Sequence, residues 1–130
     1  MRPNLYFDCY TLVGGTGADR FDYNTGAAFS TFDIGVDIIS DFKSSELDKI
    51  VLGKMTFGLT SNVGSGFSST EEFASVGTDA AAKSSTAKIV YSLETGNLFY
   101  NPDLGVLGGE SAVAQFSGKP TLSASDFIIA

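Results

Sequence analysis

The chain contains no histidine, no tryptophan, one cysteine and only eight basic residues among 130. Without histidine it lacks the commonest transition-metal ligand and the commonest general base, and a Ser-His-Asp triad is excluded. The single Cys9 excludes an internal disulfide and a cysteine-cluster metal site. No apolar run is long enough to cross a membrane. Residues 1–5 lack the hydrophobic core of a signal peptide, so we do not expect an N-terminal secretion route.

Acidic and apolar residues are abundant. Fifteen Asp and Glu residues against eight Lys and Arg residues give a net charge of −7, and hydrophobic residues make up 43% of the chain. The excess of negative charge disfavours nucleic acid and anionic lipid as partners and suits a protein that binds cations. A chain of this length and hydrophobic content predicts one domain with a core of moderate size.

One glycine-rich stretch combines a backbone pattern with a candidate ligand. Residues 14–22 read GGTGADRFD, which fits the nine-residue pattern G-G-x-G-x-D-x-U-x with Phe21 as the large apolar residue U. Glycines allow the carbonyl groups of a tight turn to converge, and Asp19 adds a carboxylate oxygen. Calcium takes six to eight such oxygen ligands. We therefore predict a calcium-binding turn, followed by a short strand that begins near Phe21.

The register of this stretch continues in steps of nine. Gly17, Gly26 and Gly35 occupy the fourth position of three successive nonapeptides, and Asp19 and Asp37 occupy the sixth position of the first and third. The register favours a decaying repeat over chance agreement. In a parallel β-roll two nonapeptides complete one coil, so residues 18 apart stack, and Asp19 and Asp37 would face one calcium ion. The alternative for Asp37 is a solvated loop carboxylate.

The stretch at residues 14–22 resembles the calcium-binding nonapeptide repeats of RTX proteins, and two other segments carry a resemblance to the same family. Residues 37–42 (DIISDF) and 47–52 (LDKIVL) resemble the segment that follows the last repeats of RTX proteins, although the family more often has a glycine where 43–46 lie. Residues 89–100 (IVYSLETGNLFY) and the segment up to 130 resemble the C-terminal module of RTX proteins secreted by type I systems. In that family the extreme C-terminus belongs to an uncleaved secretion signal. The resemblance implies the non-catalytic end of a secreted, calcium-binding protein.

We accordingly predict an all-β single domain in which a short parallel calcium-binding β-roll coil is capped by an antiparallel C-terminal sheet, with one short helix. The β-roll remnant and its cap occupy residues 5–52, a loop with the helix occupies 53–88, and the C-terminal sheet occupies 89–130. The predicted metal-site residues are Gly14, Gly15, Thr16, Gly17, Asp19 and Asp37. The apolar residues that would cover the open end of the roll are Ile39, Phe42, Ile50 and Leu52.

Local signals predict the smaller elements. Residues 11–13 fit a strand, either from an earlier repeat without calcium chemistry or from no repeat at all. Within the loop, a short strand is expected near residues 55–57, and a mobile surface segment at 78–86. Ser69 and Glu72 fit a capping box, which predicts a brief helix that contains Phe73 and Ala74.

The C-terminal third is expected to consist of strands. Residues 89–93 and 97–100, joined by a short glycine-containing turn, predict a β-hairpin. Residues 112–116 predict a further strand, and residues 127–129 predict a final one. This final strand is compatible with a secretion signal, because the exporter would read the segment before the domain folds. Asn101 to Asp103 occupy the place of the family's second acidic loop, where the loss of one carboxylate favours a plain turn over a calcium site.

The functional expectation is a secreted domain that binds calcium, folds with its help, is read by a type I exporter, and is not an enzyme. The main alternative is a metal-independent structural or adhesive β-sandwich module, and a more distant one is an enzyme that uses carboxylates only.

Overall fold

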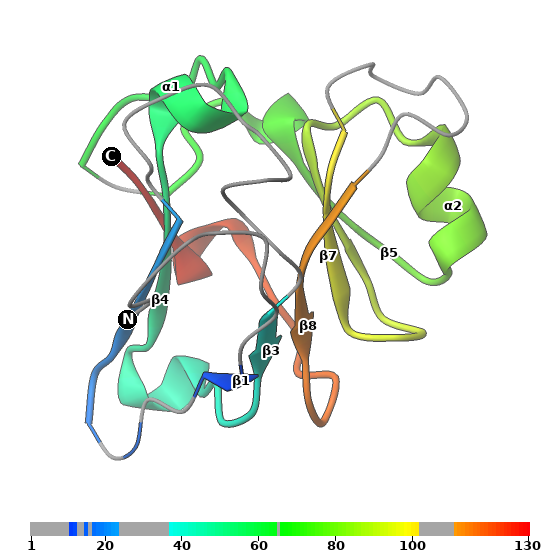
Figure 1. The fold of residues 1–130 in the computed structure, drawn as a ribbon. Helices are drawn as coiled ribbons and strands as arrows, with labels where there is room; N and C mark the ends of the chain where they lie inside the picture. Colours follow the sequence, from blue (N-terminus) through cyan, green and yellow to red (C-terminus); the bar gives the residue numbers. More distant parts are fainter. Residues whose placement is uncertain (1–10, 13–14, 16, 24–36, 65, 102–110) are drawn as a thin grey trace.

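A computed structural model describes residues 11–12, 15, 17–23, 37–64, 66–101 and 111–130 (Figure 1). In these residues the strands are β1 (Thr11–Leu12), β2 (Arg20–Tyr23), β3 (Asp37–Ile39), β4 (Lys49–Leu52), β5 (Phe73–Val76), β6 (Ile89–Ser92), β7 (Asn97–Tyr100), β8 (Ser111–Phe116) and β9 (Phe127–Ile129). The helices are α1 (Lys54–Phe57) and α2 (Asp79–Ser84), with 3-10 turns at Ser44–Glu46, Thr70–Glu72 and Ala124–Asp126. None of the helices described here has the length and hydrophobicity needed to cross a membrane.

The strands form two sheets. One sheet has the order β1-β3-β8-β7-β6-β5, and the other has the order β2-β4-β9. All strand pairs of the three-stranded sheet are parallel, and β1, β3 and β8 also pair in parallel. The pairs β6–β7 and β7–β8 are antiparallel, whereas β5 pairs with β6 in parallel. The described part of the molecule is therefore mainly β, with one mixed sheet, one parallel sheet and two short helices.

The chain alternates between the two sheets. Strands β1, β3 and β8 belong to the six-stranded sheet, and the strands that follow each of them in the sequence, β2, β4 and β9, belong to the three-stranded sheet. Figure 1 shows β4 and the C-terminal strand on one side of the molecule and β3, β8 and β7 on the other. The two sheets do not close into one coil within the described residues. The antiparallel character predicted for 89–130 holds for β6 to β8, but β9 pairs in parallel with β4.

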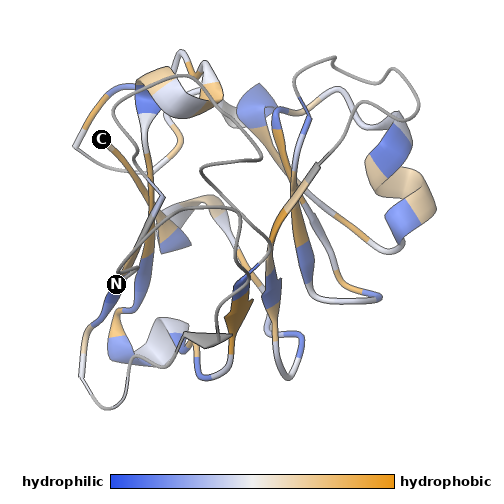
Figure 2. Cartoon of the chain, viewed as in Figure 1, coloured by the Kyte–Doolittle hydropathy of each residue, from blue (hydrophilic) through white to orange (hydrophobic). Residues whose placement is uncertain are grey.

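The core fills the space between the sheets. Phe42, which follows β3, places its ring 5.4 Å from that of Phe116 on β8 and 6.2 Å from that of Phe21 on β2. Figure 2 shows apolar stretches along the strands and more hydrophilic residues in many of the turns. The four apolar residues expected to cover the roll, Ile39, Phe42, Ile50 and Leu52, are all buried in this core.

Several local predictions are confirmed. The hairpin is formed by β6 and β7, and Tyr91 lies opposite Leu98 in it. Strands are present at residues 11–12, 20–23, 111–116 and 127–129, close to the predicted positions. The hairpin was predictable because its turn, 93–96, lies within the same short segment and contains Gly96, which has a positive φ of 77°.

The predictions for residues 53–88 are mostly wrong. Residues 54–57 form α1 instead of a strand, and residues 73–76 form β5 instead of a helix. The predicted surface segment at 78–86 contains α2, whose first turn is capped because the Thr78 hydroxyl oxygen accepts a hydrogen bond from the Ala81 N–H (3.1 Å). The described residues thus contain two short α-helices, and neither is the one expected.

Glu72 explains why the expected capping box does not form. Its carboxylate accepts hydrogen bonds from the backbone N–H groups of Thr60 (2.7 Å) and Ser61 (2.9 Å) and from the Ser61 hydroxyl (2.7 Å). The Ser69 side chain makes no capping hydrogen bond, and its backbone N–H donates to Ser61 Oγ (3.1 Å). The carboxylate therefore closes the loop between α1 and β5, because it binds backbone groups from the far side of that loop.

This buried carboxylate makes the stability of the domain sensitive to acid. Burial by itself raises the pKa of Glu72, but the hydrogen bonds from Ser61 and Thr60 outweigh it and hold the pKa below its ordinary value. Because the pKa is lower in the folded state, the stabilisation is present above the unfolded-state pKa and is lost as the pH falls through the folded-state pKa. We expect the melting temperature of Glu72→Gln to depend less on pH between about 5 and 3 than that of the parent. Melting curves across this range, with the exposed Glu71→Gln as control, test it; parallel pH profiles for Glu72→Gln and the parent would contradict it.

Candidate functional site

The glycine-rich turn lies immediately before β2. Gly15 and Gly17 have φ angles of 86° and 85°, a left-handed region that residues with a Cβ rarely adopt. The Gly15 N–H donates a hydrogen bond to Asp41 Oδ2 (2.8 Å), so the turn contacts the segment that follows β3. Gly14 and Thr16, which the sequence also assigns to the metal site, lie outside the described residues.

Asp19 lies at the end of this turn and is partly buried. Its N–H donates to Asp48 Oδ1 (2.9 Å), and its carbonyl oxygen accepts from the Lys49 N–H (2.8 Å). Its own Oδ2 is buried and has no hydrogen-bond partner in the part of the chain that the structure describes. A buried carboxylate oxygen without a donor is unfavourable unless a donor or a cation satisfies it. Asp19 therefore provides an available hard oxygen beside the turn.

Asp48 joins two turns from adjacent strands. It is fully buried, and its two oxygens accept hydrogen bonds from the backbone N–H groups of Asp19 (2.9 Å) and Lys43 (3.0 Å). Asp48 and Asp41 were not among the residues that the sequence assigned to the site. A signal for Asp48 exists, because Asp19 and Asp48 each precede a basic and then an apolar residue at the start of a strand: residues 19–21 read DRF and 48–50 read DKI.

Asp37 lies in the other sheet. It is the first residue of β3, is fully buried, and is paired in register with Ala114 of β8. Tyr23 Oη donates a hydrogen bond to Asp37 Oδ2 (3.2 Å). The alternative of a solvated loop carboxylate is wrong, because this side chain is inside the molecule.

The prediction that residues 18 apart stack on each other is also wrong for β2. The strand beside β2 is β4, and Arg20 lies opposite Lys49. The residue whose carboxylate reaches the Asp19 backbone is Asp48, at a separation of 29 residues. The pairing of Asp19 with Asp37 rested on the step of 18, and the structure instead brings Asp19, Asp41 and Asp48 to the same pair of turns.

The chemistry of these donors suits calcium, whereas their arrangement supplies only part of a coordination shell. Every side-chain donor is a carboxylate oxygen, the type that calcium prefers. Among the described residues, however, no group of three or more His, Cys, Asp or Glu side chains is arranged to hold a metal ion. Both oxygens of Asp48 already accept backbone hydrogen bonds. Asp19 Oδ2, in contrast, has no hydrogen-bond partner among the described residues.

Of residues 101–103, which align with the second acidic loop of the RTX family, the structure describes only Asn101. Asn101 is fully buried; its side-chain N–H donates to the Ser85 carbonyl oxygen (2.6 Å), while its Oδ1 has no partner among the described residues. Pro102 and Asp103 lie outside the described residues. The prediction of a plain turn there stays a prediction.

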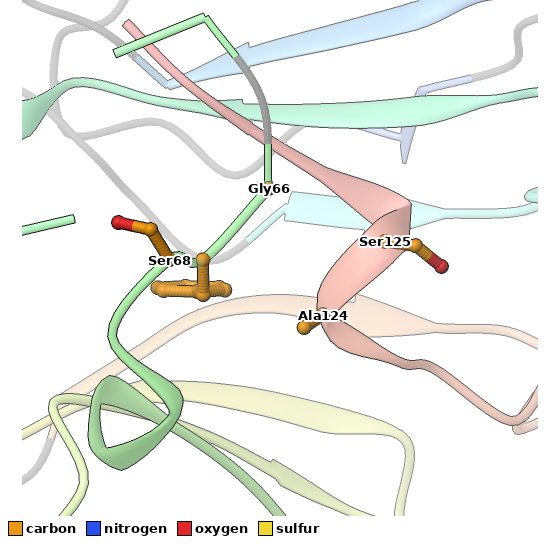
Figure 3. A pocket seen from close by; sticks show the side chains of 5 residues that line it. Gly66, Ser68, Ala124 and Ser125 are labelled. Atoms are coloured by element: carbon orange, nitrogen blue, oxygen red, sulfur yellow. The ribbon is translucent and has the colours of Figure 1, made fainter. Parts of the chain in front are cut away.

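A separate hollow of about 310 Å³ lies between the segment before β5 and the turn before β9 (Figure 3). It is lined by Gly66, Phe67, Ser68, Ala124 and Ser125. The Ser68 hydroxyl already accepts a hydrogen bond from the Asn62 N–H (2.8 Å). None of the lining residues titrates near neutral pH, so the hollow offers no acid–base pair.

Comparisons of the chain with protein-family models, with curated proteins and with solved structures find no match.

Proposed function

We propose that this chain is a calcium-binding, non-catalytic domain similar to the C-terminal module of RTX proteins, and that calcium helps it to fold. The observation that carries the proposal is the carboxylate of Asp19. One of its oxygens is buried without a partner among the described residues, directly after a turn whose glycines adopt left-handed conformations. This combination offers one hard, anionic ligand beside a backbone shape that allows carbonyl groups to converge.

The strand order is compatible with a diverged β-roll. In such a roll the chain alternates between two parallel sheets, and β1 to β4 alternate in this way. We propose that residues 5–52 descend from such a coil and that its strands have since gained other neighbours. The calcium turn would then lie on the loop between one sheet and the next.

In this proposal each residue of the turn has a physical role. Asp19 supplies a carboxylate oxygen, and carbonyl groups of the turn Gly14, Gly15, Thr16 and Gly17 supply neutral oxygens. Asp48 holds the backbone of Asp19 in place through its hydrogen bond. Asp37 is named by the sequence pattern only, because the structure places it in the other sheet, where the Tyr23 hydroxyl donates to its carboxylate. Calcium, when bound, neutralises the carboxylate charge, and it stabilises the folded state because it binds the unfolded chain poorly.

Secretion is the second part of the proposal. Residues 126–130 would be read by a type I exporter, which would place the domain outside the cell, where calcium is plentiful. In the folded domain residues 127–129 form β9, with Phe127 and Ile129 buried. A signal in this segment would therefore be accessible only before folding.

One observation favours the alternative, a metal-independent structural or adhesive module. The carboxylate of Asp48 already satisfies two backbone N–H groups by itself, and a continuous apolar core connects the two sheets. Such a domain would fold without any cation. Chelation separates the two proposals, because only the calcium-binding domain would melt at a lower temperature when calcium is removed.

The central test is a calcium titration of the parent and of Asp19→Asn, followed by circular dichroism and thermal melting. With few charged ligands, we expect a dissociation constant of about 10⁻⁴–10⁻³ M. At ten times that concentration calcium should stabilise the parent by about 1.4 kcal/mol, a rise of a few degrees in melting temperature. Asp19→Asn should lose most of this rise, whereas Glu71→Gln, which removes the same charge from an exposed site, should keep it.

Two outcomes would contradict the proposal. An equal calcium-dependent rise in Asp19→Asn and in the parent would remove Asp19 from the site. Complete unfolding on chelation would contradict the weak affinity, because the core should remain folded without metal. Asp37→Asn tests the sequence pattern separately: a lost calcium-dependent rise in this variant would restore Asp37 as a ligand, and an unchanged rise would remove it.

A further inference from the structure

Among the described strands, β5 (Phe73–Val76) is the last strand at one edge of the six-stranded sheet, and this outer side is called the open edge below. It pairs with β6 on one side only, with Phe73 opposite Ile89 and Val76 opposite Ser92. The Val76 carbonyl oxygen accepts a hydrogen bond from the Leu93 N–H (2.9 Å), so the backbone of Val76 faces β6. Because successive residues of a strand direct their backbone groups to opposite edges, those of Phe73 and Ser75 face outward. None of the described residues forms a backbone hydrogen bond on that outer side.

The open edge is uncharged but has carboxylates at both ends. Glu71, which is exposed, lies two residues before β5. At the other end lie Asp79 and Glu94, which are held together because the Asp79 N–H donates to Glu94 Oε1 (3.1 Å). Lys88, which directly precedes β6, already donates a hydrogen bond to the Gly58 carbonyl oxygen (2.8 Å).

These charges disfavour a second copy of the chain as the occupant. Two β5 strands paired antiparallel about a twofold axis would bring Glu71 of each copy near Asp79 of the other. Like charges placed opposite each other are destabilising, and the net charge of −7 adds a longer-range repulsion between copies. An extended segment with basic residues at its ends would gain attraction at the same positions.

We propose that the β5 edge binds an extended, basic segment of another protein by strand addition. The outward N–H and C=O groups of Phe73 and Ser75 supply the hydrogen bonds, and Glu71, Asp79 and Glu94 select positive charge at the two ends of the bound segment. The proposal is independent of calcium, because none of these residues belongs to the turn before β2.

The probe is a capped five-residue peptide with lysine at both ends and valine and threonine between, compared with the same peptide carrying glutamate at both ends. Backbone-amide NMR of the full chain should show shifts centred on Phe73 and Ser75 with the lysine peptide. Binding should be at least about tenfold weaker for the glutamate peptide, and weaker in high salt. Shifts elsewhere, no shifts, or equal binding of both peptides would overturn the proposal.

Ser75→Pro tests the edge itself. It removes the outward N–H and leaves the hydrogen bonds of Ala74 and Val76 to β6, a substitution that edge strands tolerate. It should abolish the shifts, whereas Ser75→Ala, which keeps the N–H, should retain them. If Ser75→Pro does not fold, the double variant Glu71→Gln and Glu94→Gln provides a second test. This variant should bind the lysine peptide no more tightly than the glutamate peptide. A retained preference, or a size that grows with protein concentration, would overturn the assignment of a basic partner.

Discussion

Deleting Phe127 to Ala130 should lower the free energy of unfolding by about 5 kcal/mol or more, enough to unfold most of the domain at ambient temperature. The deletion removes β9, the partner of β4, and two buried apolar side chains, Phe127 and Ile129. Removing a buried Phe side chain typically costs about 3–5 kcal/mol and a buried Ile about 2–5 kcal/mol, against a total stability of about 5–15 kcal/mol.

The packing around β9 supports this magnitude. The Phe127 ring lies 5.2 Å from that of Phe67 and 5.0 Å from that of Phe73, so the strand closes the aromatic part of the core. The Ala130 carbonyl oxygen accepts from the Lys54 N–H (2.7 Å), and the Ile129 carbonyl oxygen accepts from the Gly64 N–H (2.8 Å). The last residues thus hold both α1 and the loop after it.

Urea denaturation of point variants provides a graded version of this test. Ile129→Ala should lower stability by about 2–4 kcal/mol, whereas Ile128→Ala in the same strand should lower it by less than about 1.5 kcal/mol, because Ile128 is only half-buried. Equal effects would show that β9 does not dock in this orientation. The same deletion should abolish export from a host with a matching type I exporter, and undiminished export would remove the secretion signal from the proposal.

Asp48→Ala should destabilise the domain by about 2–4 kcal/mol, because it leaves the N–H groups of Asp19 and Lys43 without acceptors. Each unsatisfied backbone N–H typically costs about 1–3 kcal/mol, and partial exposure of these two places the sum toward the lower end. The variant should also weaken calcium binding at Asp19, since the backbone of Asp19 would lose its anchor.

The matched control for Asp48 is Asp41→Ala. Asp41 also accepts a backbone hydrogen bond across the two turns, from the Gly15 N–H, but this bond is exposed, so water can replace it. We expect a loss of about 1 kcal/mol or less for Asp41→Ala in chemical denaturation at neutral pH. A smaller effect for Asp48→Ala than for Asp41→Ala would contradict the structural role assigned to Asp48.

Segments whose structure depends on residues close to them in the sequence were predictable. The hairpin of β6 and β7 is defined by two apolar runs and the turn between them, and all of its interactions lie within twelve residues. The strand at residues 127–129 was predictable because a run of three large apolar residues favours burial, and Phe127 and Ile129 are indeed buried. In contrast, β5 was mistaken for a helix because Ser69 and Glu72 have capping-box spacing, while the Glu72 carboxylate binds Thr60 and Ser61 instead.

For the candidate site, the sequence predicted the turn itself but not the residues that contact it. The glycines and Asp19 could be read from the nonapeptide, since their pattern reflects local backbone conformation, and Gly15 and Gly17 do have positive φ angles. The residues that contact Asp19 could not be read in the same way, because the step of 18 assumes an uninterrupted regular coil. The segment between β2 and β4 is longer than one such coil, so Asp48 takes the place that the pattern had given to Asp37.

The sequence by itself determined that this protein is rich in strands, has a net negative charge, contains a glycine turn that ends in an aspartate, and lacks the residues for histidine or cysteine-cluster chemistry. The tertiary structure alone decided which strands are neighbours: β4 between β2 and β9, and β8 beside β3. The physical reason is that backbone hydrogen bonds between parallel strands are the same for any residue type, so pairing is selected by which side chains can be buried together across the whole chain. The same selection buried Asp37 and Asp48 and placed β5 at the end of the strand order of the described sheet.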